Sequence, residues 1–373
     1  MSEKWTYFNP VRIVKGAGNF ERVGEYARTW IQQRQVKTTE AIREQTWLLI
    51  TTEGSTRRGL TKRLLAQFTD EIVHVFDRVT PNPELDDLEA LINEYASVNI
   101  TGIIALGGGS ALDAAKVLSV TLPSEPRQSL RDILTSSSQD WTTHLPVITL
   151  PTTAGTGSEV TPFATVWDST THKKYSVTGD AVYPALAILD PTLTLSLPHQ
   201  ETLYTGLDAT SHALESLWNR NATPISQAYA ATALEAIVKA FPIALSVPDN
   251  LEARASMLQA SMLAGLAISQ TRTALAHSIS YPVTSHFGVP HGLACSFTLP
   301  VLLEDSFSFL PEGYRPLLKQ VQKLLLNLKL DREIRKYVDD TGLLALQDGM
   351  YTPDRAGNYI GEVCLTRILK KSL

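Results

Sequence analysis

Two different hydrophobic patterns divide the sequence. The first half alternates short apolar segments, rich in β-branched residues, with stretches in which apolar residues recur every three to four positions, as in Leu85–Ala96. The apolar segments are Val11–Val14, Trp47–Thr51, Ile72–Phe76, Ile103–Leu106, Val147–Leu150 and Ala187–Leu189. Strands that alternate with helices build a mostly parallel sheet with helices on both faces. The first half is therefore predicted to be an α/β domain.

The pattern changes after Pro191. From Glu201 onward strand-like segments are almost absent, and long amphipathic stretches such as Ser226–Ala240 and Leu251–Ser269 dominate. A chain of 373 residues is long enough for two hydrophobic cores. We predict an α/β domain over residues 1–193 and an all-helical domain over residues 194–373.

Charge and cysteine usage exclude several classes of protein. The chain has 33 Lys and Arg against 38 Asp and Glu, a net charge of −5, and no basic tract that would favour nucleic acid or a membrane surface. Its two cysteines, Cys295 and Cys364, have neither the number nor the spacing of a disulfide framework or a thiolate metal site. With no signal-like N-terminus and no apolar run near the length of a membrane span, a soluble cytoplasmic protein is expected.

A glycine-rich segment follows one predicted strand. The segment, LGGGSALDAAK at residues 106–116, opens a predicted helix. Glycines let the backbone approach a pyrophosphate, and the amides and positive dipole at a helix start attract it. Ser110 and Asp113 also have the spacing of a capping box, so a capped turn without a ligand is an equal alternative.

A second polar loop, PTTAGTGSEVT at residues 151–161, follows another predicted buried strand. Its hydroxyl and amide donors suit phosphate and ribose oxygens, although such a loop can also be an ordinary surface segment. Two loops of this kind, each after a parallel-type strand, favour a nucleotide at the carboxyl edge of the sheet.

The helical half contains a candidate metal-ligand set. Asp208 and His212 are four residues apart, which places them on one face of a helix, and His277 and His291 follow downstream. One carboxylate with three imidazoles suits Fe(II) or Zn(II). The alternatives are that Asp208 caps the helix and that the histidines are ordinary core or surface residues.

Taken together, four segments resemble the iron-dependent (group III) alcohol dehydrogenases. They are, in chain order, GGGSALDAAK, PTTAGTGSEVT, GLDATSHALES and AHSISYPVTSHFGVPHG, and the similarity runs from Asn9 to about Leu299. The resemblance implies an N-terminal dinucleotide-binding α/β domain and a C-terminal helical domain that binds one divalent metal, preferably Fe(II), with Zn(II) as the alternative. It also implies a homodimer.

The resemblance assigns ligands by position. The metal ligands it implies are Asp208, His212, His277 and His291. Pyrophosphate is expected on Gly108, Gly109 and Ser110. The residues expected around the nicotinamide and its ribose are Asp113, Thr152, Thr153, Thr156 and Lys174.

Two departures from the family pattern are informative. Many members have a further histidine four residues after the third ligand, where this chain has Tyr281. A phenol is a poor base at neutral pH but a usable hydrogen-bond donor. NAD-preferring relatives tend to place an aspartate at the position of Thr52, which here is followed by Glu53 and then by Arg57 and Arg58. Loss of that acid favours NADPH over NADH.

Within the family, the segments LWNRNATP at residues 217–224 and AISQTRTALAHSISYP at residues 267–282 are similar to the branch that reduces phosphonoacetaldehyde to 2-hydroxyethylphosphonate. Arg272, five residues before His277 in one expected helix, is predicted to anchor the phosphonate by a two-pronged hydrogen bond. An arginine paired with a surface acid is the alternative. An enzyme for a small uncharged aldehyde or diol, or a lyase similar to dehydroquinate synthase, would use the same scaffold.

Overall fold

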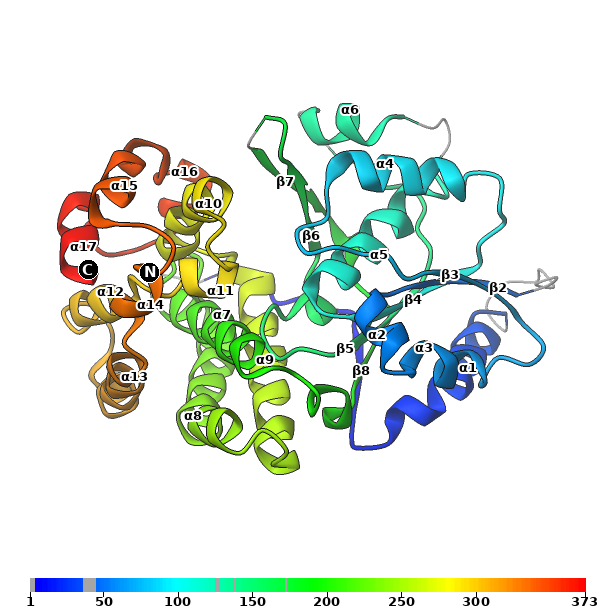
Figure 1. Cartoon of the computed structure of the whole chain (residues 1–373), viewed down its shortest axis with the longest axis horizontal. Coiled ribbons are helices and arrows are strands. Elements are labelled where there is room, and N and C mark those ends of the chain that lie inside the picture. The colour runs from blue at the N-terminus through cyan, green and yellow to red at the C-terminus, as the bar shows by residue number, and fades with distance from the viewer. Residues whose placement is uncertain (1–3, 36–44, 125–127, 137–138, 172) are drawn as a thin grey trace. The chain divides into compact units, whose positions relative to one another are not determined.

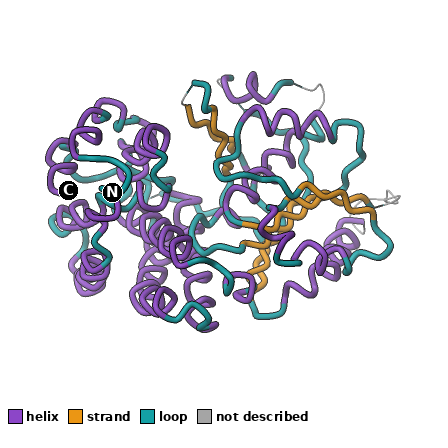
Figure 2. Tube along the Cα trace, in the orientation of Figure 1, coloured by secondary structure: helices purple, strands orange, loops and turns teal. Residues whose placement is uncertain are grey.

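A six-stranded, all-parallel sheet is formed by the apolar segments of the first half (Figures 1 and 2). In the computed structural model its order is β1 (Arg12–Lys15), β8 (Leu186–Leu189), β5 (Val147–Pro151), β4 (Gly102–Gly107), β2 (Thr46–Ile50) and β3 (Ile72–Phe76). Each predicted strand is present, and its ends agree to within one residue. The structure describes residues 4–35, 45–124, 128–136, 139–171 and 173–373.

Helices cover both faces of this sheet because successive strand residues point to opposite sides. Leu48 and Ile50 pack in one core with residues of α4 (Leu85–Glu94) and α5 (Gly109–Thr121). Trp47 and Leu49 pack in the other core with residues of α1 (Val23–Gln35) and α3 (Leu60–Leu65). A Cβ on Gly102 would lie 2.5 Å from the Trp47 ring, so the close packing of that indole needs a glycine on β4.

The α/β part also contains a second, smaller sheet and two short helices. An antiparallel pair, β6 (Phe163–Asp168) and β7 (Lys173–Thr178), follows the second polar loop. Two short helices, α2 (Glu53–Arg57) and α6 (Leu130–Thr135), are each capped at the N-terminus by a hydroxyl side chain, from Thr52 and Ser129 respectively.

From Leu195 the described chain consists of helices and their connecting loops (Figure 2). The long helices are α7 (His199–Leu217), α8 (Pro224–Ser246), α9 (Leu251–Thr271), α10 (Leu275–Phe287) and α13 (Arg315–Asn327). The shorter ones are α11 (His291–Ala294), α12 (Leu299–Ser306), α14 (Leu330–Ile334), α15 (Asp340–Ala345), α16 (Pro353–Ala356) and α17 (Leu365–Ser372). The predicted α/β and all-helical classes are therefore both present.

The chain divides into two units, and neither unit is one continuous stretch of sequence. The α/β unit is Pro10–Thr153 with Ser158–Thr194, and the helical unit is Met1–Asn9, Ala154–Gly157 and Leu195–Leu373. The predicted domains were each continuous, whereas part of the second polar loop belongs to the helical unit. A Cβ on Gly155 would lie 2.7 Å from Cβ of Thr205, so this loop packs directly on α7.

Helix α8 is more apolar than expected from the sequence, in which no run near the length of a membrane span was found. Among the described residues, α8 alone has the length and mean hydropathy, 1.4, of a membrane span, and 39% of that window is buried within the protein. It packs against α7 and α9, and its buried residues, such as Ala230, Leu234 and Phe241, recur at helical spacing. This pattern is that of a core helix of the helical unit.

Candidate metal centre and cofactor-binding edge

Helix α7 presents three chemically active side chains on one face. Asp208, His212 and Glu215 are spaced by four and three residues, which is the repeat of one helix surface. All three are buried, and α7 is buried along most of its length. A buried polar face of this kind must bind partners or a ligand, because unpaired polar groups are costly away from water.

Three histidines converge on the Asp208 carboxylate. Its Oδ1 atom lies 3.5 Å from Nε2 of His212, 3.5 Å from Nε2 of His277 on α10 and 3.8 Å from Nε2 of His291 at the start of α11. The rings of His212 and His277 are stacked, with centroids 4.7 Å apart. The structure thus brings together all four residues that the sequence suggested as metal ligands, although they are separated by up to 83 positions in the chain.

The donor atoms of this cluster fit a divalent cation. Nε2 of His277 is buried and has no hydrogen-bond partner in the described structure, so its lone pair is available to a metal. Burial disfavours ionisation of Asp208, but the imidazoles outweigh it and hold the pKa of the carboxyl well below its usual range. An ionised carboxylate with three imidazole nitrogens is a ligand set for Fe(II) or Zn(II).

Glu215 contacts the cluster on the Nδ1 side of His277, and the sequence analysis did not identify it as a site residue. Its carboxylate accepts a hydrogen bond from Nδ1 of His277 at 2.6 Å, and it also accepts from the backbone N–H of Ala274 and Ala276 at 3.0 and 2.6 Å. Because Nδ1 carries the proton, Nε2 is the nitrogen that faces the centre. Its place in the 208, 212, 215 repeat was a signal for this role.

Cys295 is also part of the cluster, which corrects the sequence reading that set aside both cysteines as metal-site residues. One potential ligand atom from each of Asp208, His277, His291 and Cys295 lies within 4.8 Å of the other three. The thiol donates weakly to Asp208 Oδ1, with 3.6 Å between sulfur and oxygen, and burial raises the pKa of the thiol well above its ordinary value. As a neutral thiol it supports the carboxylate rather than adding negative charge.

The predicted cofactor residues lie at the carboxyl edge of the sheet. Thr52 follows β2, Gly108 caps α5 directly after β4, and Thr153 follows β5. The chain runs from β2 to β3 on one side and from β4 to β5 on the other, so β2 and β4 flank a switch point, the usual nucleotide position in such sheets. A Cβ on Gly108 would lie 3.3 Å from the Thr153 side chain, so glycine allows the two loops to approach.

The polar loops are joined by two side chains of α5. Asp113, one of the predicted nicotinamide residues, accepts from Ser158 Oγ at 2.6 Å and from the Thr165 N–H at 2.8 Å. Lys116 is fully buried, and its Nζ donates to Ser158 Oγ and to the Phe163 carbonyl oxygen at 2.9 and 2.8 Å. These contacts give the Asp and Lys of the first motif a structural role in holding the second.

The remaining predicted cofactor residues are spread over several elements. Ser110 Oγ accepts from the Asn82 N–H at 3.2 Å in the first turn of α5, which Gly109 begins. Thr152 is buried, and its N–H donates to the Gly107 carbonyl oxygen at 2.9 Å. Two further residues complete the set: Lys174 on β7 lies over the Trp167 ring, and Thr156 belongs to the helical unit.

Arg272 does not lie in the helix of His277, so the spacing argument for it fails. Helix α9 ends at Thr271, Arg272 has a positive φ of 61°, and α10 begins only at Leu275. Asn219 Nδ2 donates to the Arg272 carbonyl oxygen at 3.1 Å, and the Arg272 residue is exposed. Its assignment as the phosphonate anchor therefore no longer has support from helical geometry.

Tyr281 lies one turn after His277 on α10. Burial raises the pKa of its hydroxyl to about 12, so the phenol stays protonated and acts only as a hydrogen-bond donor or neutral acceptor near pH 7. The structure therefore agrees with the chemical reading that this side chain is no general base.

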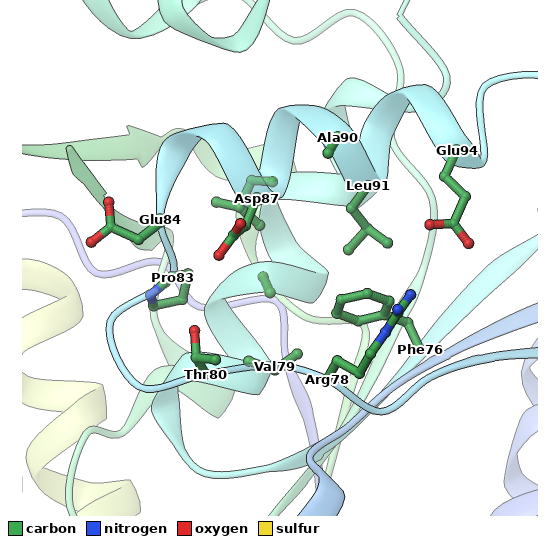
Figure 3. A pocket seen from close by; sticks show the side chains of 12 residues that line it. Phe76, Arg78, Val79, Thr80, Pro83, Glu84, Asp87, Ala90, Leu91 and Glu94 are labelled. Carbon is green, nitrogen blue, oxygen red and sulfur yellow. The ribbon is translucent and has the colours of Figure 1, made fainter. Parts of the chain in front are cut away.

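A separate pocket of about 290 Å³ opens beside α4 in the α/β unit (Figure 3). The Arg78 guanidinium lies over the Phe76 ring on one wall, and Glu84, Asp87 and Glu94 supply acidic groups. None of the predicted cofactor residues is among those that line it. The acidic groups make this pocket unsuited to a phosphate.

Comparison with known proteins agrees with this site chemistry. The model of the iron-containing alcohol dehydrogenase family matches residues 10–191, and that of the C-terminal part of Fe-containing alcohol dehydrogenases matches residues 202–340. The chain is 37% identical to a probable alcohol dehydrogenase, EutG, of Escherichia coli K12 over 60% of this chain and only 55% of that protein. It is 31% identical to long-chain-alcohol dehydrogenase 1 of Geobacillus thermodenitrificans over 83% of this chain and 80% of that one.

Among solved structures, the sulfoacetaldehyde reductase of Bifidobacterium kashiwanohense in complex with NAD+ superimposes with a TM-score of 0.87 at 27% identity, covering 100% of this chain and 98% of that one. The two family models match both halves of the sequence, and the chain belongs to the iron-containing alcohol dehydrogenase family.

Proposed function

We propose that this protein is a metal-dependent, NADPH-preferring oxidoreductase that reduces phosphonoacetaldehyde to 2-hydroxyethylphosphonate. The observation that supports a metal-dependent reduction is the buried Asp208 carboxylate with three imidazole Nε2 atoms around it, one of which, that of His277, has no hydrogen-bond partner. A site of this composition is suited to a cation that keeps a position open for substrate.

The two bound groups would supply the chemistry that the chain lacks. When bound, a divalent cation polarises a carbonyl oxygen as a Lewis acid, and a reduced nicotinamide provides hydride. The chain's own residues hold and orient these groups. Asp208, His212, His277 and His291 provide the ligand atoms, and Glu215 fixes the tautomer and orientation of His277. Tyr281 remains protonated and can orient the water or hydroxyl that supplies the final proton.

The NADPH preference is supported by the polar groups after β2. Thr52 Oγ1 accepts from the Ser55 N–H at 3.2 Å, and a guanidinium nitrogen of Arg58 lies 3.5 Å from Ser55 Oγ. Two hydroxyls and a cation suit a 2′-phosphate, whereas a carboxylate would suit the ribose diol. Comparing KM for NADPH and NADH tests this preference directly.

The anionic substrate is supported by the similarity to a sulfoacetaldehyde reductase, which extends over the whole chain. Sulfoacetaldehyde and phosphonoacetaldehyde share an aldehyde two bonds from a tetrahedral anionic centre. The second candidate is an enzyme for uncharged alcohols and aldehydes, which the similarity to a long-chain-alcohol dehydrogenase favours.

The two candidates are separated by one assay. NADPH and NADH absorbance is followed with phosphonoacetaldehyde and with propanal, each before and after addition of Fe(II) or Zn(II) to metal-stripped protein. We expect metal-dependent oxidation of NADPH and at least tenfold higher kcat/KM for phosphonoacetaldehyde. Equal or higher kcat/KM for propanal would favour the second candidate, and no nicotinamide oxidation with either aldehyde would reject both.

A further inference from the structure

Arg355, which the sequence reading did not single out, lies beside the helix that carries His277. It belongs to α16, a short helix in the C-terminal part of the helical unit. Its guanidinium carbon lies 4.9 Å from the centre of the Tyr281 ring, and its Nη1 donates to Thr273 Oγ1 at 3.4 Å. Thr273 and Tyr281 lie four residues before and after His277, so Arg355 spans the segment that contains this ligand.

The three side chains form a polar cluster, which we call the Arg355 cluster: Thr273, Tyr281 and Arg355. The Thr273 side chain lowers the pKa of the Tyr281 hydroxyl, so the two hydroxyls lie close to each other. Thr273 is buried, and the Arg355 side chain is 26% exposed, so the cluster lies at the border of the protein interior. The cluster therefore offers one positive charge and two hydroxyls to a ligand.

The ion pair between Arg355 and Asp354 is weak. Its Nε lies 3.8 Å from Asp354 Oδ2, and the Asp354 side chain is 68% exposed. An ion pair of this length, with one partner largely in solvent, contributes little free energy.

The backbone around Arg355 is fixed on α10. Asn358 Nδ2 donates to the Thr273 carbonyl oxygen at 2.9 Å, and the Thr352 N–H donates to Ser278 Oγ at 2.9 Å. Ser278 Oγ in turn donates to the Met350 carbonyl oxygen at 2.7 Å. These bonds hold the segment that carries the guanidinium, so Arg355 is positioned before any ligand binds.

The distance along α10 between His277, a proposed metal ligand, and Tyr281, in the Arg355 cluster, suits a very small substrate. His277 and Tyr281 are one turn apart on the same face of α10, a rise of about 5.4–6 Å. In phosphonoacetaldehyde or sulfoacetaldehyde, two bonds separate the carbonyl carbon from the charged tetrahedral centre. An aldehyde oriented toward the His277 side would bring such an anion to the Arg355 cluster.

From this geometry we infer that Arg355, with the hydroxyls of Thr273 and Tyr281, binds the tetrahedral anionic head group of the aldehyde substrate. This inference rests on the proposed function. A guanidinium can bind two oxygens of a phosphonate or sulfonate with parallel charge-assisted hydrogen bonds. It replaces Arg272 as the anion-binding residue, because Arg272 is exposed and follows the end of α9.

The test compares Arg355→Gln with the wild type and with Arg272→Gln as the matched control. KM and kcat are measured for phosphonoacetaldehyde, sulfoacetaldehyde and propanal, all with the same cofactor and metal. Loss of one charge-assisted pair of about 2–3 kcal/mol corresponds to a 30- to 150-fold rise in KM for the preferred anionic aldehyde. We expect propanal kinetics to change less than twofold, Arg355→Lys to restore part of the loss, and Arg272→Gln to resemble the wild type.

A binding measurement keeps the test independent of turnover. Calorimetry with 2-hydroxyethylphosphonate, 2-hydroxyethanesulfonate and 1-propanol should show weaker binding of the anions, but not of propanol, to Arg355→Gln. The tighter of the two anions in the wild type identifies the head group. Equal losses for propanal and the anionic aldehydes, or an anion-specific loss in Arg272→Gln instead, would overturn the inference.

Failure of the proposed function has a different outcome. A wild-type enzyme that reduces propanal but neither anionic aldehyde would reject the proposed substrate and, with it, this inference. A wild-type enzyme that reduces an anionic aldehyde, combined with unchanged KM and binding in Arg355→Gln, would reject the inference alone.

Discussion

Two buried polar clusters in this protein differ in how their polar atoms are satisfied. In the α/β unit, Lys116 makes three hydrogen bonds, to Ser158 Oγ, Thr161 Oγ1 and the Phe163 carbonyl oxygen, and both carboxylate oxygens of Asp113 accept one. In the helical unit, the Nε2 atoms around Asp208 lie 3.5–3.8 Å from its Oδ1 atom, and that of His277 has no hydrogen-bond partner.

This difference separates a structural cluster from a binding cluster. Burial of a polar atom without a partner is costly, and where that atom belongs to a set of metal-ligand donors, a bound cation can supply the missing partner. The Lys116 cluster joins the two predicted nucleotide-binding loops through hydrogen bonds within the protein. The Asp208 cluster has its ligand atoms close to one another, as a cation-binding site requires.

The largest effect is expected from His212→Ala in the binding cluster. Loss of one ligand atom should weaken binding of the divalent cation and lower kcat/KM by at least about 10³-fold. The reason is that the cation, acting as a Lewis acid, supplies several kcal/mol of transition-state stabilisation. Metal analysis should show less than one cation per chain after dialysis, while NADPH affinity stays within about twofold of the wild type.

The control is His286→Ala, which removes an exposed histidine from the same helix as His277. It should retain metal content and activity. Substantial turnover by His212→Ala, with a full complement of metal, would show that His212 is not a ligand and would leave Cys295 as the candidate for the fourth donor.

An intermediate effect, on stability and not on metal content, is expected from Lys116→Met. The substitution keeps an apolar chain of similar length but leaves buried acceptors without their donor and Asp113 without its cation, a loss of about 3 kcal/mol. Urea unfolding should show a lower midpoint, with one cation per chain retained. Lys173→Met, an exposed lysine of the same unit, is the control, and a reduced metal content in Lys116→Met would contradict the separation of the two clusters.

The sheet could be predicted because burial on both faces leaves each strand as a continuous apolar run bounded by polar or glycine residues. The ligand set could be suggested because Asp208 and His212 share a helical repeat and because the motifs resemble a known family. Spacing alone could not show that His277 and His291 approach the same carboxylate, since that depends on the packing of α7, α10 and α11.

Two predictions from the sequence were wrong because they depend on contacts between residues far apart in the chain. The segment from Ala267 to His277 contains no glycine or proline, so its periodicity predicts one helix. The break occurs because Glu215 accepts the free N–H groups of Ala274 and Ala276 and thereby caps α10 from another helix. Cys295 was set aside because cysteine counting detects all-thiolate sites, not one thiol beside a carboxylate.

The smallest effect is expected from Glu159→Gln, at the one carboxylate oxygen of the Lys116 region that has no partner. Glu159 is buried, its Oε1 atom makes no hydrogen bond, and burial raises its pKa to about 7. Because the carboxyl binds its proton more tightly in the folded than in the unfolded protein, it stabilises the fold fully at pH values below its ordinary pKa near 4.5. This stabilisation is lost as the pH rises through 7. Glutamine cannot ionise, so the Tm of the variant minus that of the wild type should increase between pH 5 and pH 8, by about 3 °C for each 1 kcal/mol. Glu94→Gln, at an exposed carboxyl of the same unit, should show no such change, and a difference for Glu159→Gln that is constant with pH would mean that the buried carboxyl does not ionise in this range.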